Sequence, residues 1–298
     1  MIAVVFETAG PLDRAVRDDY LNRLGLDAEP PSVDGLRRLT RRQVERVPYE
    51  TLWIAAGEAW DLDPHRSAAR IARLGRGGYC YHLNGALGLL LTSLGYTVHG
   101  HVGGVHGAEG PTDAERGNHL VLTVDGLPTA ANPAGVWYVD TGLGDALHDP
   151  LPLMAGPHDQ PPFRLVLERI DDETWHLVHD PLGGFGGMVW TAAIARRSDF
   201  EAKHGWLSSS PESGFVRVPM AERRDATGVD VIRGLVLSRI GAGARTDEPV
   251  TRRADWFDVL ADVFDLTFEA STPAARDRLW ATVLAAHQAR EAESEAEG

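Results

Sequence analysis

Apolar positions divide the chain into a helical first third and a strand-rich middle. From Leu83 to Leu94 the leucines recur at three- and four-residue spacing, which places them on one face of a helix. The predicted helix opens at Cys80, and Gly95 follows it as a C-terminal stop. Because Cys80 lies three residues before Leu83, the spacing predicts that the thiol shares the buried face.

Weaker helix signals precede this one. A segment from 12 to 26 carries leucines on one face and a glycine near its end. Ser32 is a suitable N-cap for a second helix that Pro48 closes, and we expect Ser67 to cap a third that stops at Gly75.

After Tyr96 the chain turns to short runs rich in β-branched residues, which favour strands. The predicted strands of the middle part cover residues 96–105, 118–124, 136–140, 163–170, 174–180 and 183–190. The last third mixes two predicted strands with two predicted helices, at 215–220, 230–240, 255–264 and 273–289. The order predicts an α+β protein of three packed units, residues 1–96, 97–205 and 206–298.

Composition narrows the choice of partners and location. The formal net charge of −14 disfavours a nucleic acid or an anionic membrane as partner, and residues 291–298 are typical of a solvated acidic tail. No apolar run is long enough to span a bilayer, and the first residues lack the basic start of a signal peptide. A single cysteine cannot form an internal disulfide, so we expect a cytoplasmic protein.

Cys80 is a candidate nucleophile. A buried cysteine is usually only a small hydrophobic residue. Here Gly77 and Gly78 allow a sharp turn before it, and the first turn of a helix favours a thiolate. The thiol also lies where the helical and β parts join, a place where clefts form.

His119 and Asp140 complete a candidate triad. His119 opens an apolar strand that would bury it, and Asp140 ends the next strand. If the two strands pair as a hairpin, the carboxylate can orient the imidazole and stabilise its charged form. Taken singly, each residue also has a structural interpretation, as a packed core histidine or a turn-capping aspartate. The ordered set of Cys80, His119 and Asp140 favours catalysis.

A metal site is not expected. The pair His99 and His101 shares one face of a strand and is the nearest approach to a ligand set. No cysteine or carboxylate cluster accompanies these histidines, so we predict no metal ligands.

The motifs resemble the arylamine N-acetyltransferase family over most of the chain. The segments that carry the resemblance are VPYETL (47–52), RGGYCYHLN (76–84), HLVLTV (119–124), YVDTGLGD (138–145), HDPLGGFGGM (179–188) and LSSSPESGFVR (207–217). The resemblance implies a cysteine-protease-like core with an N-terminal helical bundle, a central antiparallel β-barrel and a C-terminal α/β lid. It also implies an ion pair between Glu50 and Arg76 that braces the site.

By this resemblance, Cys80 accepts an acetyl group from acetyl-CoA and passes it to an arylamine or hydrazine by double displacement. His119 is the base and Asp140 the orienting carboxylate. Gly142 and Gly144 line the cleft that admits the pantetheine arm of CoA. Acetyl-CoA is thus a co-substrate, and no tightly bound cofactor is expected.

The chain departs from the family pattern at three points, and the last two concern the acceptor. His119 and Asp140 lie 21 positions apart, further than is usual in the family, because a Pro- and Gly-containing loop at 127–135 separates them. His82 stands where the family usually has Glu or Gln, and Leu143 where it commonly has an aromatic residue.

Three other hypotheses stay open on the sequence. The first is an amide synthase that takes an acyl chain from an acyl carrier protein and closes a macrolactam. The second is a thiol hydrolase or transglutaminase-like enzyme. The third is a binding module in which Cys80 only packs.

Overall fold

The computed structural model describes residues 10–241, 243–268 and 271–297. The predicted absence of a signal peptide concerns residues 1–9, which lie outside this range. The helices in the described part are α1 (Arg14–Leu24), α2 (Val33–Arg46), α3 (Leu52–Ala55), α4 (Pro64–Leu74), α5 (Cys80–Ser93), α6 (Ser198–Ser209), α7 (Gly214–Arg217), α8 (Arg253–Phe264) and α9 (Pro273–Glu297).

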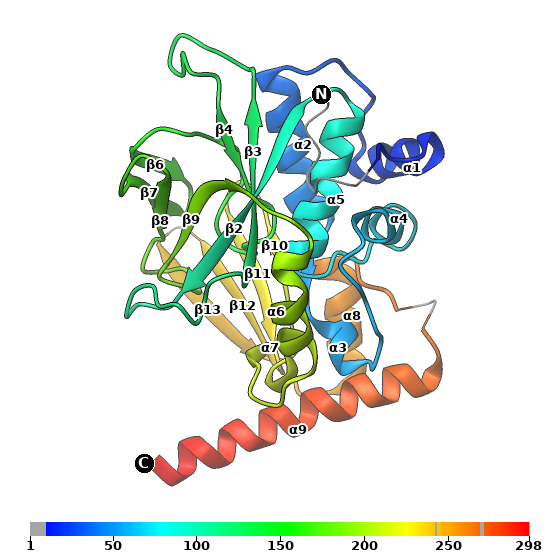
Figure 1. Cartoon of the computed structure of the whole chain (residues 1–298). Helices are drawn as coiled ribbons and strands as arrows, with labels where there is room; N and C mark the ends of the chain where they lie inside the picture. Colours follow the sequence, from blue (N-terminus) through cyan, green and yellow to red (C-terminus); the bar gives the residue numbers. More distant parts are fainter. Residues whose placement is uncertain (1–9, 242, 269–270, 298) are drawn as a thin grey trace.

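Helix α5 is the centre of the helical part. It packs between α4 and the strands β2 (Thr97–His106) and β3 (His119–Asp125), as Figure 1 shows. Every residue from Cys80 to Thr92 is buried, so the helix is covered on all sides and not only on the leucine face. Apolar burial of this extent fixes the position of Cys80 against the β part.

An eight-stranded antiparallel sheet forms the middle of the molecule. Its strands, in spatial order, are β5 (Leu151–Pro152), β4 (Trp137–Val139), β3, β2, β9 (Gly187–Ile194), β8 (Thr174–Val178), β7 (Phe163–Arg169) and β6 (Gly156–Gln160). The two edge strands follow each other in the chain with only three residues between them. The sheet therefore curls into a nearly closed barrel, and with the helices it confirms the predicted α+β class.

A second antiparallel sheet joins the N-terminal helical part to the C-terminal third. Its order is β1 (Tyr49–Glu50), β10 (Met220–Arg224), β11 (Gly228–Arg233), β12 (Val236–Gly241) and β13 (Ala244–Pro249). Tyr49 pairs with Glu222. This pairing ties the segment that follows α2 to the C-terminal third. Helix α6 spans the predicted boundary at 205, and the division into three units stays a proposal.

Four local predictions were wrong. Helix α4 begins at Pro64 with Asp63 as N-cap, because Asp followed by Pro is a stronger start than Ser67. Residues 214–217 form helix α7, so the strand predicted for 215–220 begins only at Met220.

The other two corrections concern the C-terminal third. The strand predicted for 230–240 is the hairpin β11–β12, which turns at Gly234 with a positive φ. Helix α9 continues to Glu297 through most of the predicted acidic tail, and Gly298 lies outside the described residues.

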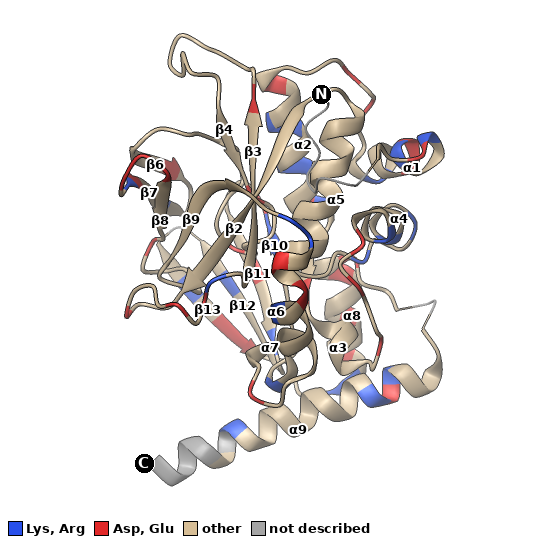
Figure 2. Cartoon of the chain, viewed as in Figure 1, with Lys and Arg blue, Asp and Glu red and all other residues tan. Residues whose placement is uncertain are grey.

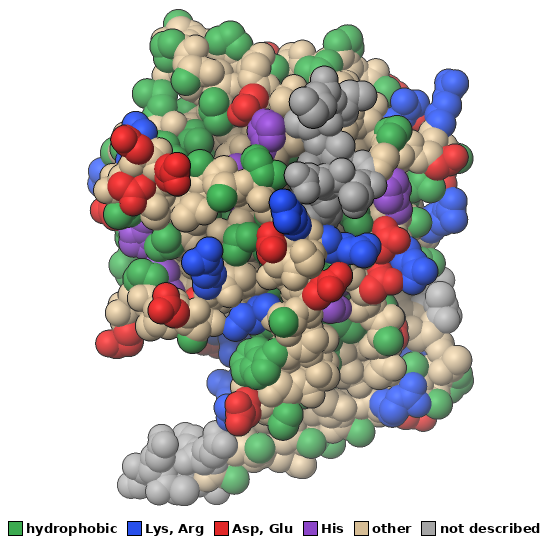
Figure 3. Space-filling view, in the orientation of Figure 1, with side chains coloured by type: hydrophobic (Ala, Val, Ile, Leu, Met, Phe, Trp, Pro, Cys, Tyr) green, Lys and Arg blue, Asp and Glu red, His purple; other side chains and the backbone are tan. Residues whose placement is uncertain are grey.

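Surface charge is mixed on the face shown in Figures 2 and 3, where acidic and basic side chains are interspersed among the coloured residues. Among the described residues, no helix is both long and apolar enough to cross a bilayer.

Candidate active site

Two glycines bring the chain to the start of α5. Gly78 has φ of 83°, in the left-handed region that favours glycine. A Cβ on Gly77 would lie 2.0 Å from the carbonyl oxygen of Pro48, so a side chain does not fit there. Cys80 is the first residue of α5, and the N-cap Tyr79 provides no side-chain hydrogen bond to the first turn. The thiol therefore lies at an open, electropositive helix end.

The predicted ion pair braces this turn from behind. Arg76 Nε donates to Glu50 Oε1 at 2.6 Å, and a second guanidinium nitrogen of Arg76 donates to Glu50 Oε2 at 3.2 Å. Burial lowers the pKa of Arg76, but the charges of Glu50 and Glu58 and the hydrogen bonds to both together raise the pKa above its usual value. Glu50 N also donates to Gly78 O at 2.9 Å, which fixes the turn directly.

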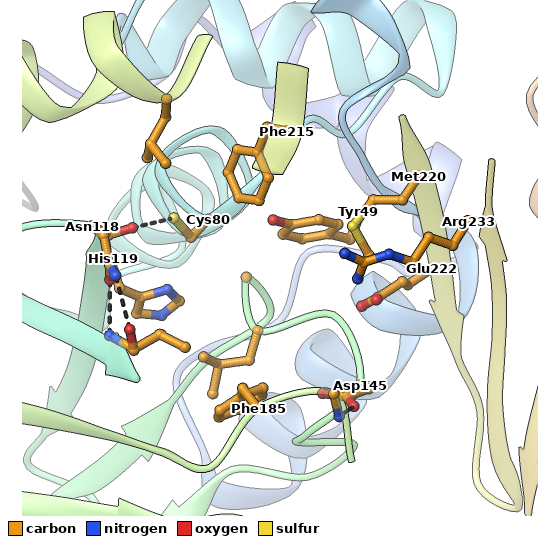
Figure 4. Close-up of a pocket in the computed structure, with 15 residues that line it drawn as sticks. Tyr49, Cys80, Asn118, His119, Asp145, Phe185, Phe215, Met220, Glu222 and Arg233 are labelled. Atoms are coloured by element: carbon orange, nitrogen blue, oxygen red, sulfur yellow. Dashed lines mark hydrogen bonds between the residues drawn. The ribbon is translucent and has the colours of Figure 1, made fainter. Parts of the chain in front are cut away.

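His119 and Asp140 meet as the hairpin hypothesis required. Strands β3 and β4 are antiparallel neighbours, and His119 Nε2 lies 2.7 Å from Asp140 Oδ2. The Cys80 thiol donates to the carbonyl oxygen of Asn118 at 3.4 Å, next to His119 in the chain. With Nε2 occupied by Asp140, the imidazole has Nδ1 left for the thiol. Figure 4 shows Cys80, Asn118 and His119 together at the edge of a pocket.

The site polarises His119 strongly. Burial lowers the pKa of His119, but the negative charges of Asp140 and Cys80, and the hydrogen bonds to both, raise it to about 10. His119 therefore holds a proton at neutral pH.

Asp140 is held by donors on every side. Its Oδ1 accepts from Asn84 Nδ2 at 2.7 Å and from Gly142 N at 2.9 Å, and its Oδ2 accepts from Tyr138 Oη at 2.9 Å. Sequence reasoning assigned no role to Asn84 or Tyr138. Spacing was the available signal, because Asn84 is one helical turn after Cys80 and Tyr138 is two residues before Asp140 on one strand.

A cavity of about 300 Å³ opens beside these groups. Figure 4 shows Cys80 and His119 on one wall, and Glu222 and Arg233 on the opposite wall. The residues that line it are Tyr49, Cys80, Val105, Asn118, His119, Gly142, Leu143, Asp145, Gly184, Phe185, Leu207, Phe215, Met220, Glu222 and Arg233. The lining is mainly apolar with a few charged groups, as in sites for small organic ligands.

The predicted glycines lie in the loop between the two walls. A Cβ on Gly142 would be 2.5 Å from Cys80 Cα, and one on Gly144 would be 1.7 Å from a carboxylate oxygen of Glu222. Close packing thus excludes any side chain at either position. Gly142 lines the cavity, whereas Gly144 packs beneath Glu222.

Glu222 differs from the other carboxylates of the site. Burial and then the charge of Asp145 raise its pKa well above the usual value, against the opposing charge of Arg233. The protonated form of this carboxyl group is therefore favoured more than in an exposed glutamate.

His82 lies behind the catalytic turn and not in the cavity. Its ring is packed among Trp53, Trp60, Tyr79 and His204 at centroid distances of 4.8 to 5.8 Å. Neither ring nitrogen has a hydrogen-bond partner in the described part of the chain. This departure from the usual Glu or Gln therefore changes the support of the site and not its lining.

Arg224 and the pair His99 and His101 make contacts within the protein outside the cavity. Arg224 is buried and donates to the carbonyl oxygens of Gln160 and Pro161. His99 pairs with Asp125 and His101 with Thr123, so they do not point at a common ligand.

The chain is similar to known proteins in sequence and in fold. The profile of the N-acetyltransferase family matches residues 32–272. The chain is 32% identical over 207 residues to the arylamine N-acetyltransferase of Mycolicibacterium smegmatis, covering 66% of this chain and 72% of that protein. The chain belongs to the arylamine N-acetyltransferase family. The predicted resemblance is thus confirmed, and the protein is an acyltransferase of this family.

Solved structures of arylamine N-acetyltransferases agree with the fold. The structure from M. smegmatis has a TM-score of 0.78 at 26% identity, over 89% of this chain and 97% of that one. The Mycobacterium marinum arylamine N-acetyltransferase in complex with CoA has a TM-score of 0.77 at 25% identity, over the same shares of the two chains.

Proposed function

We propose that this protein transfers an acetyl group from acetyl-CoA to an arylamine or hydrazine through an acyl-cysteine at Cys80. The observation that carries the proposal is the buried His119–Asp140 pair beside a thiol that lines the cavity. Membership of the arylamine N-acetyltransferase family and a relative solved with CoA support the choice of donor and acceptor. We place the reaction in the cytoplasm, where the single cysteine stays reduced.

The first half-reaction makes the acyl-enzyme. The Cys80 thiolate attacks the thioester carbonyl, and a carbon–sulfur bond forms to give a tetrahedral intermediate. Collapse of the intermediate breaks the bond to CoA, and the His119 imidazolium gives its proton to the departing thiolate. We propose that first-turn N–H groups of α5, including that of Cys80, stabilise the oxyanion.

The second half-reaction uses the same groups in reverse. Neutral His119 takes a proton from the amine as the amine attacks the acyl-cysteine carbonyl. The amide leaves, and Cys80 and His119 return to the thiolate–imidazolium pair. Throughout, Asp140 orients the ring and stabilises its charged form.

The volume of the cavity favours a small acyl group over a large one. We propose that the pantetheine arm passes along Gly142, which packs directly on Cys80 and leaves the backbone accessible. A volume of about 300 Å³ is at the lower end for ligand pockets. It suits an acetyl group and a small amine, whereas a macrolactam precursor on a carrier protein needs a wider cleft.

Intact-mass spectrometry after mixing with acetyl-CoA alone tests the acyl-enzyme. We expect one acetyl group per chain, located on Cys80 by peptide mapping, and none in Cys80→Ser. An added arylamine or hydrazine should then remove the acetyl group from Cys80 faster than water does. Double-reciprocal plots of the initial rate against one substrate, at several fixed concentrations of the other, should give parallel lines. Failure of any acyl-CoA to label Cys80 would overturn the proposal, and discharge by water at an equal rate indicates a hydrolase.

A further inference from the structure

Two histidines converge on the barrel sheet outside the catalytic cavity. His106 ends β2 and His176 lies on β8, the two strands that flank β9 in the sheet (Figure 1). Their Nε2 atoms are 3.1 Å apart, and their ring centroids are 5.2 Å apart. No step of the proposed reaction uses either residue.

Both rings have already used Nδ1 as a donor. His106 Nδ1 lies 2.8 Å from the carbonyl oxygen of Gly107, and His176 Nδ1 lies 3.0 Å from a carboxylate oxygen of Glu168. These oxygens only accept, so each Nδ1 carries a hydrogen. A neutral imidazole has one N–H, and both Nε2 atoms therefore direct lone pairs at the same gap. Two nitrogen lone pairs at this distance repel each other unless a positively charged species lies between them.

The strand between the two histidines leaves the gap open. Gly187 on β9 pairs with His106 on one side and with Val178 on the other. A Cβ at Gly187 would lie 2.8 Å from His106 Nε2, so glycine is needed for the two rings to meet. His106 is buried, whereas the side chain of His176 is 18% exposed, which gives the gap an opening to solvent.

We propose that His106 and His176 form a binding site for a divalent transition-metal ion of the Zn²⁺, Cu²⁺ or Ni²⁺ class, with water as the remaining ligands. Neutral imidazole nitrogen is a preferred ligand of these ions. Two nitrogens on one tetrahedral zinc ion, each at about 2.0–2.1 Å, lie roughly 3.3 Å apart, close to the separation found here. Glu168 and the Gly107 carbonyl orient the rings, as carboxylates and carbonyls do behind metal-bound histidines.

The site has only two protein ligands, which makes the ion exchangeable. Among the described residues, no group of three or more His, Cys, Asp or Glu side chains is arranged to hold a metal. The pair also differs from His99 and His101, the pair that the sequence brought forward. A proton shared between the two rings is the competing way to satisfy both lone pairs.

Calorimetric titration with ZnCl₂ and CuCl₂ separates the two explanations. Tag-free protein in the Cys80→Ser background is used throughout, because the catalytic thiolate binds the same ions. We expect one ion per chain, with affinity that falls as pH falls because protons compete for Nε2. His176→Gln lowers the affinity at least tenfold, and Glu168→Gln lowers it by about 10- to 100-fold.

His158→Gln is the matched control, because His158 is a half-buried histidine whose Nε2 lies 3.1 Å from the Met154 carbonyl oxygen. It leaves the affinity unchanged. Electron paramagnetic resonance of the Cu²⁺ complex should show two coordinated nitrogens, reduced to one in His176→Gln. No ion bound by the parent, or binding unaffected by both His106→Gln and His176→Gln, overturns the proposal and leaves a shared proton in the gap.

Discussion

His119 and His82 lie on opposite sides of the catalytic turn and differ in charge although both are buried. The two residues are 2% and 0% exposed. The pKa of His119 is raised to about 10, against the effect of burial, by Asp140 and Cys80. The pKa of His82 falls well below 6.5, through burial first and then through the charges of Arg70 and His204.

Burial alone therefore does not determine the protonation states of these two histidines. The charged and polar groups around each ring determine them. A carboxylate within hydrogen-bond distance makes the charged ring stable at one position. A cage of aromatic rings and a nearby arginine make the neutral ring stable at the other. The turn before Cys80 thus has a charged histidine on the side of the cavity and a neutral histidine packed on the other side.

Removal of the charge that stabilises His119 is the strongest test of this comparison. The new amide of Asp140→Asn has two possible orientations. In the first, its NH₂ faces Asn84 Nδ2 and Gly142 N, which are both donors, so no hydrogen bond forms there. In the second, its NH₂ faces Tyr138 and His119. The second choice forces His119 into the tautomer that cannot accept a proton from Cys80. We expect kcat/KM for acetyl transfer to fall by about 10³- to 10⁴-fold.

Asp125→Asn is the matched control, because Asp125 forms a second His–Asp contact with His99 at 3.1 Å outside the cavity. Stopped-flow acylation of Cys80 and near-ultraviolet circular dichroism should show a slow but folded Asp140→Asn and a normal Asp125→Asn. Equal rates for the two variants would remove Asp140 from the mechanism.

The alkaline side of the stability curve tests the raised pKa of His119. Below about pH 6.5 the native and unfolded states both hold this proton. Between 6.5 and about 10 only the native state holds it. Up to about pH 8.5 the unfolded state instead holds the proton that the proposed Cys80 thiolate lacks in the native state, so the numbers of bound protons differ only from about 8.5 to 10. Urea unfolding of the wild type should therefore lose about 2 kcal/mol from pH 8.5 to 10. The His119→Gln variant lacks this contribution, and parallel curves for the two proteins would contradict it.

Local sequence signals predicted what depends on near neighbours. The leucine spacing and Gly95 gave helix α5, and adjacent strands brought His119 to Asp140. The wrong cap at Ser67 shows a competing local signal, because Asp63 and Pro64 form the stronger start. The pairing of Tyr49 with Glu222 joins strands far apart in the chain, and no periodicity within either segment indicates it.

The state of the site residues was harder to predict than their identity. The order of Cys80, His119 and Asp140 follows from motifs. The raised pKa of Glu222 depends on burial and on the charge of Asp145, which only the folded arrangement supplies. The lowered pKa of His82 also depends on the folded arrangement, because its ring packs against Trp53 of α3 and His204 of α6.

Replacement of His82 by phenylalanine is the mildest test. Because neither nitrogen of His82 is hydrogen bonded, an apolar ring of similar shape should change the free energy of unfolding at pH 7.5 by no more than about 1 kcal/mol. His204→Phe is the contrasting control, because His204 contacts Tyr79 Oη and the Trp60 carbonyl oxygen and its loss should cost about 1–3 kcal/mol.

The loss of stability at acidic pH should differ between the wild type and His82→Phe. The lowered pKa of His82 means that, below pH 6.5, the unfolded state takes up a proton that the native state does not. Wild-type stability therefore falls as pH drops from 6.5, and part of that loss should be absent in His82→Phe. Urea unfolding at pH 7.5, 6.5 and 5.5 measures both effects. A variant as destabilised as His204→Phe, with an unchanged acid slope, would show that His82 has a polar partner and that the neutral side of the turn is not neutral.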